Sequence, residues 1–143
     1  MAVHLLSPLE RLLEAAHWPV FKGWMRGVRN RDHCDSLACE LLGAIVARDR
    51  TFVRVLRHWA IASNPWFRRA AAMAVWKRVG QMGDVDAALS VCEPLMRDRH
   101  PAVVEAVDRV LAGCLASDAP TTEEFLERWK RRLPFPKPSY TLP

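Results

Sequence analysis

Helix-start signals recur along the chain, and they limit the folds that it can adopt. Ser7, Pro8 and Glu10 match a capping box with proline at the first helical position. Asn64-Pro65 repeats the arrangement of a capping residue followed by proline. No segment alternates apolar and polar residues with the period of two that marks a half-buried strand. The sequence therefore predicts an all-α protein.

These signals divide the chain into a series of predicted helices. The first is expected to run from Ser7 to about Trp18, and the second to follow Pro19. The later helices are expected to begin near Asp32, Thr51, Asn64, Asp84, His100 and Thr121. Each of these starts has a polar residue placed to accept a hydrogen bond from the first helical turn, or lies beside one.

Two predicted boundaries depend on particular residues. Glycine adopts the left-handed backbone that closes a helix, so Gly80 and Gly83 are expected to end the helix that begins at Asn64. Thr121 followed by Glu124 matches a second capping box, so the last helix is expected to begin at Thr121.

Alternate helix starts are evenly spaced, which predicts a repeat. These starts are Asp32, Pro65 and Pro101. Their separation lies within the range of HEAT-like repeats, and superposing them places Asp35, Arg69 and Glu105 at one equivalent position. In a solenoid such positions share one surface. We therefore predict a superhelix of stacked antiparallel helix pairs, with an irregular bundle of evenly spaced helices as the alternative.

The chain has 143 residues, and half of them are hydrophobic. This is sufficient for one domain with a hydrophobic core. We assign residues 1–133 to a single helical-repeat domain. Residues 134–143 contain four prolines in ten positions. Proline removes backbone donors and favours extended conformations, so this segment is expected to be an extended tail.

The cysteines and the hydropathy of the chain indicate the cellular compartment and whether a metal or cofactor is expected. The cysteines form no C-x-x-C pair and lie among apolar neighbours, so we expect reduced core thiols. His33 beside Cys34 has no second pair at ligand spacing, so neither a metal nor another cofactor is expected. No apolar run approaches the roughly 18 residues of a membrane span, and the N-terminus lacks the basic leader of a signal peptide. We expect a cytoplasmic protein without a membrane partner.

Basic residues are in excess, with 21 Lys and Arg against 16 Asp and Glu and a formal charge of +5. The excess is concentrated between Arg48 and Val79, where Asp49 is the single acid. The basic residues of this stretch are Arg48, Arg50, Arg54, Arg57, Arg68, Arg69, Lys77 and Arg78. Side chains of this kind supply sequence-independent affinity for DNA phosphates. Ordinary solvated charges with buried stems are the alternative.

Two stretches resemble one family. Residues 57–71, RHWAIASNPWFRRAA, resemble a helix junction of the HEAT-like-repeat DNA alkylation repair glycosylases, the AlkD and AlkC group, in which a Trp-bearing helix and a polar turn precede a W-x-x-R-A start. Residues 30–37, NRDHCDSL, are similar to the family's W-D-x-x-D segment. Both occur in the family's order, and the similarity covers roughly residues 20–132. The chain looks like a member shortened at the N-terminus.

The resemblance implies a function and a site. It implies a DNA glycosylase that acts on alkylated duplex DNA, with Asp35 as the catalytic aspartate and Arg69 holding the DNA backbone. A purine alkylated at N3 or N7 is already a good leaving group, so its excision needs mainly stabilisation of an oxocarbenium-like sugar by a carboxylate. The family grips the lesion on a concave surface without a deep pocket. For Asp35, a helix-start carboxylate favoured by the helix dipole is the alternative role.

The chain departs from the family pattern at two aromatic positions. Arg31 stands where the family has Trp four residues before the aspartate, and Arg109 is the nearest match to a second active-site Trp. A guanidinium offers no π face to a cationic base, but it can contact phosphate. We therefore expect the phosphate contacts to be Arg31, Arg68, Arg69, Lys77 and Arg109.

Three functions follow from these features. The leading hypothesis is a monomeric DNA alkylation repair enzyme that binds alkylated duplex DNA and excises N3- or N7-alkylpurines. A catalytically inactive DNA-binding homologue is the second, because DNA binding tolerates the arginine substitutions better than excision does. A helical-repeat scaffold that binds another protein is the third, and an apolar concave face would favour it.

Overall fold

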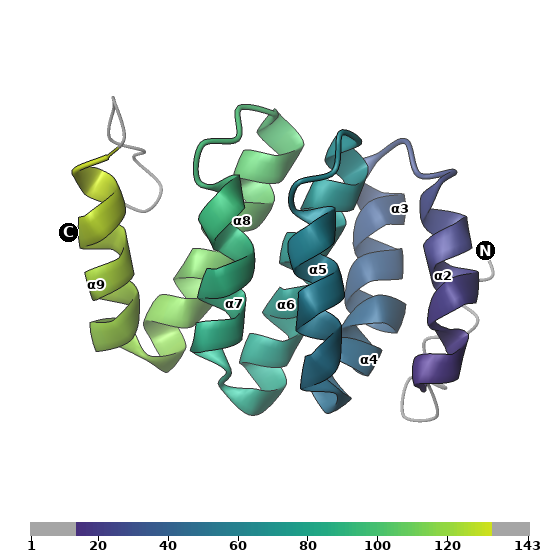
Figure 1. Cartoon of the computed structure of the whole chain (residues 1–143), viewed down its shortest axis with the longest axis horizontal. Coiled ribbons are helices and arrows are strands. Elements are labelled where there is room, and N and C mark those ends of the chain that lie inside the picture. The colour runs from purple at the N-terminus through teal and green to yellow at the C-terminus, as the bar shows by residue number, and fades with distance from the viewer. Residues whose placement is uncertain (1–13, 133–143) are drawn as a thin grey trace.

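The computed structural model describes residues 14–132 of the chain, and every regular element in that range is helical (Figure 1). The prediction of an all-α fold is confirmed. The capping box predicted at Ser7 and the tail predicted for residues 134–143 lie outside the described residues.

The described elements follow one another closely along the chain. They are a 3₁₀ turn at Ala15–His17, α2 at Trp18–Met25, α3 at Arg31–Asp35, a π-helical segment at Ser36–Leu42, α4 at Gly43–Arg48, a 3₁₀ turn at Arg50–Phe52, α5 at Val53–Trp59, α6 at Pro65–Met82, α7 at Val85–Cys92, a 3₁₀ turn at Glu93–Leu95, α8 at Pro101–Ser117 and α9 at Ala119–Lys130. α3, the π-helical segment and α4 continue into one another without a break.

The helices stack in two layers (Figure 1). One layer contains α2, α5, α7 and α9, and we call it the α5 layer. The other contains α3, the π-helical segment, α4, α6 and α8, and we call it the Asp35 layer. In the Asp35 layer, α4, α6 and α8 are each followed by an antiparallel partner in the α5 layer, namely α5, α7 and α9. The chain is therefore an all-α helical-repeat fold, as predicted. The core lies between the layers.

α6 is the central helix of the stack. It packs against α4 and α8 in its own layer and against α5 and α7 in the other. Small side chains allow this, since Ala70, Ala71, Ala72 and Ala74 are all fully buried. Neighbouring helices can approach α6 closely because little side-chain volume separates the backbones.

Local signals place most helix starts correctly. The Asn64 side chain accepts a hydrogen bond from the Trp66 amide, Asp84 accepts one from Ala87, and His100 Nδ1 accepts one from Ala102. These caps confirm the starts predicted near Asn64, Asp84 and His100. Similarly, Asn30 caps the helix predicted near Asp32, which begins at Arg31.

Some predicted boundaries were wrong. The last helix begins at Ala119, because Asp118 accepts hydrogen bonds from the amide and the hydroxyl of Thr121 and is itself the cap. The capping box predicted at Thr121 is therefore absent. Gly80 lies inside α6 and does not end it, whereas Gly83, at φ 64°, does close the helix as predicted. α2 begins at Trp18, ahead of Pro19, which occupies its first turn.

Candidate functional site

The equivalent positions predicted from the repeat meet in the Asp35 layer. Asp35 of α3, Arg69 of α6 and Glu105 of α8 form one ion-pair cluster. Arg69 Nε donates to Asp35 Oδ1 at 2.8 Å and Nη2 donates to Oδ2 at 2.7 Å, while Nη1 lies 3.0 Å from Glu105 Oε1. The prediction that these residues share a face of neighbouring helices is confirmed.

Arg69 is the buried centre of this cluster. Its side chain is 1% exposed, against 25% for Asp35 and 46% for Glu105. Burial disfavours its charged form, but the hydrogen bonds and charges of Asp35 and Glu105 outweigh burial and raise the pKa of Arg69 above its ordinary value. Arg31 Nε lies 3.4 Å from Glu105 Oε1 and supplies a second cation. The cluster therefore balances two carboxylates with two guanidinium groups.

The burial of Arg69 changes the role expected for it. Besides Asp35 and Glu105, its guanidinium donates to the backbone oxygen of Ala102. A side chain that is 1% exposed and bonded in this way does not reach a DNA phosphate in this arrangement. The bidentate contact instead fixes the carboxylate plane of Asp35. The expected direct contact between Arg69 and DNA does not fit this geometry.

Two further arginines of the basic stretch are also used inside the fold. Arg68 donates to Asp98 at 2.6 Å and to the backbone oxygens of Ala62 and Ser63. Arg78 donates to Asp84 at 2.6 Å and to backbone oxygens of α4. These arginines connect neighbouring repeats, so Arg68 is not placed with Asp35 as a phosphate contact.

The remaining basic residues divide between the two layers. Arg54 and Arg57 are exposed on α5 and line a depression beside Asp86 of α7, in the α5 layer. In the Asp35 layer, Arg31 and Arg109 are exposed and Lys77 is half-buried. Of the residues that the sequence predicted to hold phosphate, Arg31, Lys77 and Arg109 are the ones that this layer presents toward solvent.

Asp35 faces an open depression of about 490 Å³. The described residues that line it are Asp32, Asp35, Ser36, Cys39, Glu40, Met73 and Arg109. Acidic side chains are more numerous than basic ones in this lining, and the Asp35 carboxylate is paired with Arg69 from the protein side. Its exposed edge is therefore the part that is available to a ligand that carries or develops positive charge.

The thiols beside Asp35 are unsuited to nucleophilic chemistry. Cys39 lines the depression and Cys34 lies next to Asp35. Burial, and then the negative charge of Asp35, raises the pKa of each thiol to about 12. The thiolate is the reactive form of cysteine, and at neutral pH both groups stay protonated. The arrangement therefore favours carboxylate chemistry over transfer of a group to sulfur.

Trp76 lies on this surface but was not among the site residues predicted from the sequence. It lies on α6 and is half-buried, and the guanidinium carbon of Arg109 lies 6.0 Å from the centre of its ring. A signal was present in the sequence, because residues seven positions apart on a helix share a side and Trp76 follows Arg69 by that interval. An aromatic face is therefore present one helical turn from Met73 of the depression.

No group of three or more His, Cys, Asp or Glu side chains within residues 14–132 is arranged to hold a metal ion. In the same range, no helix is both long enough and apolar enough to cross a membrane.

Residues 1–139 match the family model described as DNA alkylation repair enzyme. No curated protein matches the sequence.

Proposed function

The chain belongs to the DNA alkylation repair enzyme family and so has a role in DNA alkylation repair, and from this premise we propose that it is a DNA glycosylase of the AlkD and AlkC type with HEAT-like repeats. It binds alkylated duplex DNA across the Asp35 layer and releases N3- or N7-alkylpurines. The observation that supports this best is the Asp35 carboxylate, held bidentately by buried Arg69 at the edge of a depression rich in carboxylates.

Asp35 is the proposed catalytic residue. As the bond between the alkylated purine and the sugar breaks, the base leaves with the bonding electrons and positive charge develops at C1′. A carboxylate beside that carbon stabilises the developing charge, and it can accept a proton from the water that adds to C1′. The ion pair with Arg69 keeps Asp35 oriented while no substrate is present, so the site needs little rearrangement before reaction.

Arg69 is proposed as a positioning residue, because it acts on the reaction through Asp35. Arg31, Lys77 and Arg109 are proposed to hold phosphates of the lesion-bearing strand. Contacts of this kind set the position of the duplex and contribute salt-dependent affinity without reading the base sequence.

The test is base release by Asp35→Asn. This substitution nearly preserves the shape of the side chain and removes its charge. We expect the wild-type protein to release 7-methylguanine or 3-methyladenine from alkylated duplex DNA faster than buffer does. We expect the variant to be slower by about ten-fold or more, which is about 1.4 kcal/mol of transition-state stabilisation, with DNA affinity nearly unchanged.

Two matched variants distinguish a catalytic role of Asp35 from a general effect of removing a negative charge and from a loss of stability. Asp32→Asn removes a carboxylate from the same depression that makes no hydrogen bond to Arg69, and Glu105→Gln removes a carboxylate partner of Arg69 outside the depression. Both are expected to retain most of the activity. If all three variants lost base-release activity equally and had lowered melting temperatures, Asp35 would have a structural role and not a catalytic one. Base release at the buffer rate with duplex binding intact would identify a DNA-binding homologue without catalysis.

A further inference from the structure

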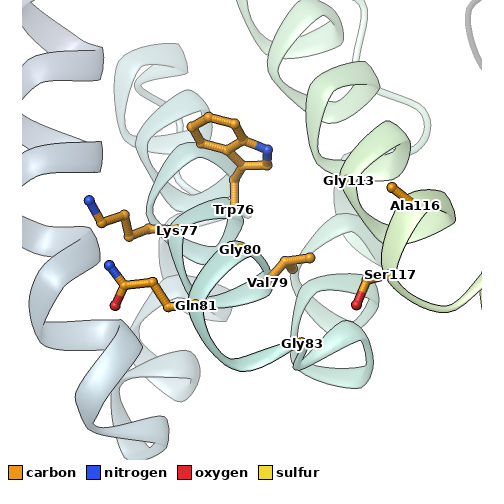
Figure 2. Close-up of a pocket in the computed structure, with 9 residues that line it drawn as sticks. All are labelled: Trp76, Lys77, Val79, Gly80, Gln81, Gly83, Gly113, Ala116 and Ser117. Carbon is orange, nitrogen blue, oxygen red and sulfur yellow. The ribbon is translucent and has the colours of Figure 1, made fainter.

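A basic depression lies in the α5 layer, away from Asp35. It measures about 480 Å³ and lies beside α5 and α7, which pack against each other (Figure 1). The described residues that line it are Arg50, Thr51, Val53, Arg54, Arg57, Asp86 and Ser90. The pocket between α6 and α8 has a different lining, in which Lys77 is the one charged residue among those described (Figure 2). Three guanidinium groups around one hollow favour an anionic ligand.

The arginines of this depression are close neighbours. Arg54 follows Arg50 by four residues and Arg57 follows Arg54 by three, and side chains at these helical spacings repel when they carry the same charge. Arg50 Nε donates to Asp84 Oδ2 at 2.9 Å. Among residues 14–132, the side chains of Arg54 and Arg57 have no hydrogen-bond or ion-pair partner. The described residues therefore do not offset the repulsion between these two arginines, and a bound anion would.

The depression also presents oxygen atoms that accept hydrogen bonds. The hydroxyl of Thr51 donates to Asp49 Oδ1, and the hydroxyl of Ser90 donates to the backbone oxygen of Ala87 at 2.7 Å. Each hydroxyl has a single proton, so both oxygens can serve only as acceptors toward a ligand. Asp86 adds an exposed carboxylate that pairs with no cation in the described part of the chain. A ligand therefore meets donors from the arginines and acceptors from three other side chains.

These two sets of groups indicate the chemistry of the ligand. A phosphomonoester carries a charge of about −1.5 to −2 at neutral pH and has three strong acceptor oxygens. It therefore matches the charge and the planar donor groups of Arg54 and Arg57. An anion without donors would be repelled by Asp86 and would leave the acceptors unused. Hydroxyl groups on the same molecule would donate to these acceptors.

We propose that this depression binds a small phosphorylated sugar or polyol. Its phosphate lies between Arg54 and Arg57, and its hydroxyl groups donate to Asp86 and Ser90. The inference goes beyond the proposed function, because the depression and Asp35 lie in opposite layers of the stack. The small ligand and duplex DNA would therefore be bound at the same time.

Two matched phosphomonoesters test the proposal. Ribose 5-phosphate carries hydroxyl groups and methyl phosphate does not. The Nε–H resonances of Arg54 and Arg57 are identified in the NMR spectrum as those that disappear in Arg54→Gln and in Arg57→Gln. We expect both compounds to shift these resonances, and ribose 5-phosphate to bind about three-fold or more tightly than methyl phosphate. Ribose alone should bind about ten-fold or more weakly than ribose 5-phosphate, because it lacks the charge-assisted hydrogen bonds.

Variants assign the two parts of the ligand to their residues, with backbone amide resonances of α5 and α7 reporting both binding and folding. Arg54→Gln with Arg57→Gln should weaken both phosphomonoesters by about ten-fold or more. Asp86→Ala removes a negative charge, which affects both compounds, and an acceptor, which affects only ribose 5-phosphate. The ratio of the two affinities should therefore fall toward one.

Arg26→Gln with Arg99→Gln is the control for charge. Both arginines are exposed, and they line neither this depression nor the Asp35 depression. The affinity for ribose 5-phosphate should change less than about two-fold, since exposed charges at a distance are largely screened by salt. An equal loss in the control pair, or equal binding of the two phosphomonoesters by the wild-type protein, would overturn the proposal.

Competition distinguishes the possible sources of the phosphate. Saturating duplex DNA should leave ribose 5-phosphate bound, and its displacement would show that the depression belongs to the DNA-binding surface. Binding of a 5′-phosphorylated oligonucleotide or of a glutamate-rich peptide, without binding of ribose 5-phosphate, would also refute the proposal. None of these measurements involves base release. A failure here therefore leaves the glycosylase proposal standing, and absence of base release leaves this proposal standing.

Discussion

Buried arginines are the residues that join one repeat to the next. Arg69 connects α3 to α8 through Asp35 and Glu105, and Arg78 connects α4 to the start of α7 through backbone oxygens and Asp84. A buried charge is costly unless it is paired and hydrogen-bonded, and removing its partner leaves that cost uncompensated. Each carboxylate partner is therefore important for the stability of the fold.

Asp84 allows this to be tested away from the proposed site. Burial would raise the pKa of its carboxyl, but hydrogen bonds from Arg78, the Ala87 amide and Arg50 outweigh burial and lower the pKa below its ordinary value. A lowered pKa means that the stabilisation is complete above the unfolded-state value of about 3.9. It is lost as the pH falls through the lower folded-state value.

We expect Asp84→Asn to lower the free energy of unfolding by about 1.5–3 kcal/mol at neutral pH, because asparagine keeps the helix cap but loses the ion pairs. Urea unfolding at a series of pH values would measure this. The difference from wild type should shrink as the pH falls below about 4. The control is Asp118→Asn, which changes a cap with no ion pair among the described residues. Its cost should stay below that of Asp84→Asn, and equal, pH-independent costs would contradict the assignment.

α4 approaches α6 closely at Gly43. The π-helical segment ends at Leu42, and the amide of the next residue, Gly43, donates to the backbone oxygen of Ala38, five residues back along the chain. A Cβ on Gly43 would lie 2.8 Å from Lys77 Cβ and 2.9 Å from the Ala38 oxygen. The wide turn and the absent side chain together bring this helix close to α6. π-helical turns are frequent at functional sites, and this one directly follows Asp35.

We therefore expect Gly43→Ala to destabilise the protein by about 1–3 kcal/mol, because the added methyl group overlaps atoms on both sides. Gly80→Ala is the matched control. Gly80 also lies in a helix, but a Cβ there would meet nothing within 4 Å. Its replacement should be neutral or stabilise by about 0.5–1 kcal/mol, because alanine favours a helix more than glycine does. Thermal unfolding of the two variants gives the comparison, and equal melting temperatures would show that α4 and α6 separate easily.

On the scale of the whole molecule, exposed basic residues lie on both layers. The Asp35 layer presents Arg31 and Arg109 beside the carboxylates of the depression, and the α5 layer presents Arg54 and Arg57. Net charge alone does not choose between these surfaces. The role proposed for Asp35 favours the Asp35 layer, because a duplex bound to the α5 layer would lie on the opposite side of the core from the carboxylate.

Paired substitutions identify the surface that meets DNA. Arg31→Gln with Arg109→Gln should weaken duplex binding and reduce the slope of log affinity against log salt by about two, one for each phosphate that is no longer neutralised. Arg54→Gln with Arg57→Gln removes the same charge and should change the slope little. Fluorescence anisotropy over a range of salt concentrations measures both slopes. A larger effect from the Arg54 and Arg57 substitutions would show that DNA binds to the α5 layer instead.

Features that act within a turn of the chain were predictable from the sequence. The caps at Asn64, Asp84 and His100, and the all-α class, depend on groups a few residues apart, and they are confirmed. Where two local signals competed, the choice was wrong. Asp118 caps the last helix in preference to Thr121 because its carboxylate accepts from the Thr121 amide and hydroxyl together. The even spacing of alternate helices also placed Asp35, Arg69 and Glu105 on one face.

What those residues do was decided by the tertiary structure. The sequence presents Arg68, Arg69 and Arg78 as part of one basic stretch, but each is bonded to groups brought in by folding, such as Asp35, which lies 34 positions from Arg69. Whether an arginine pairs internally or meets a phosphate depends on which carboxylates and carbonyl oxygens lie near it in space. Helical periodicity gives the direction of a side chain, but not the neighbour that it meets. For the same reason, only the packing of α8 against α6 placed Arg109 over Trp76.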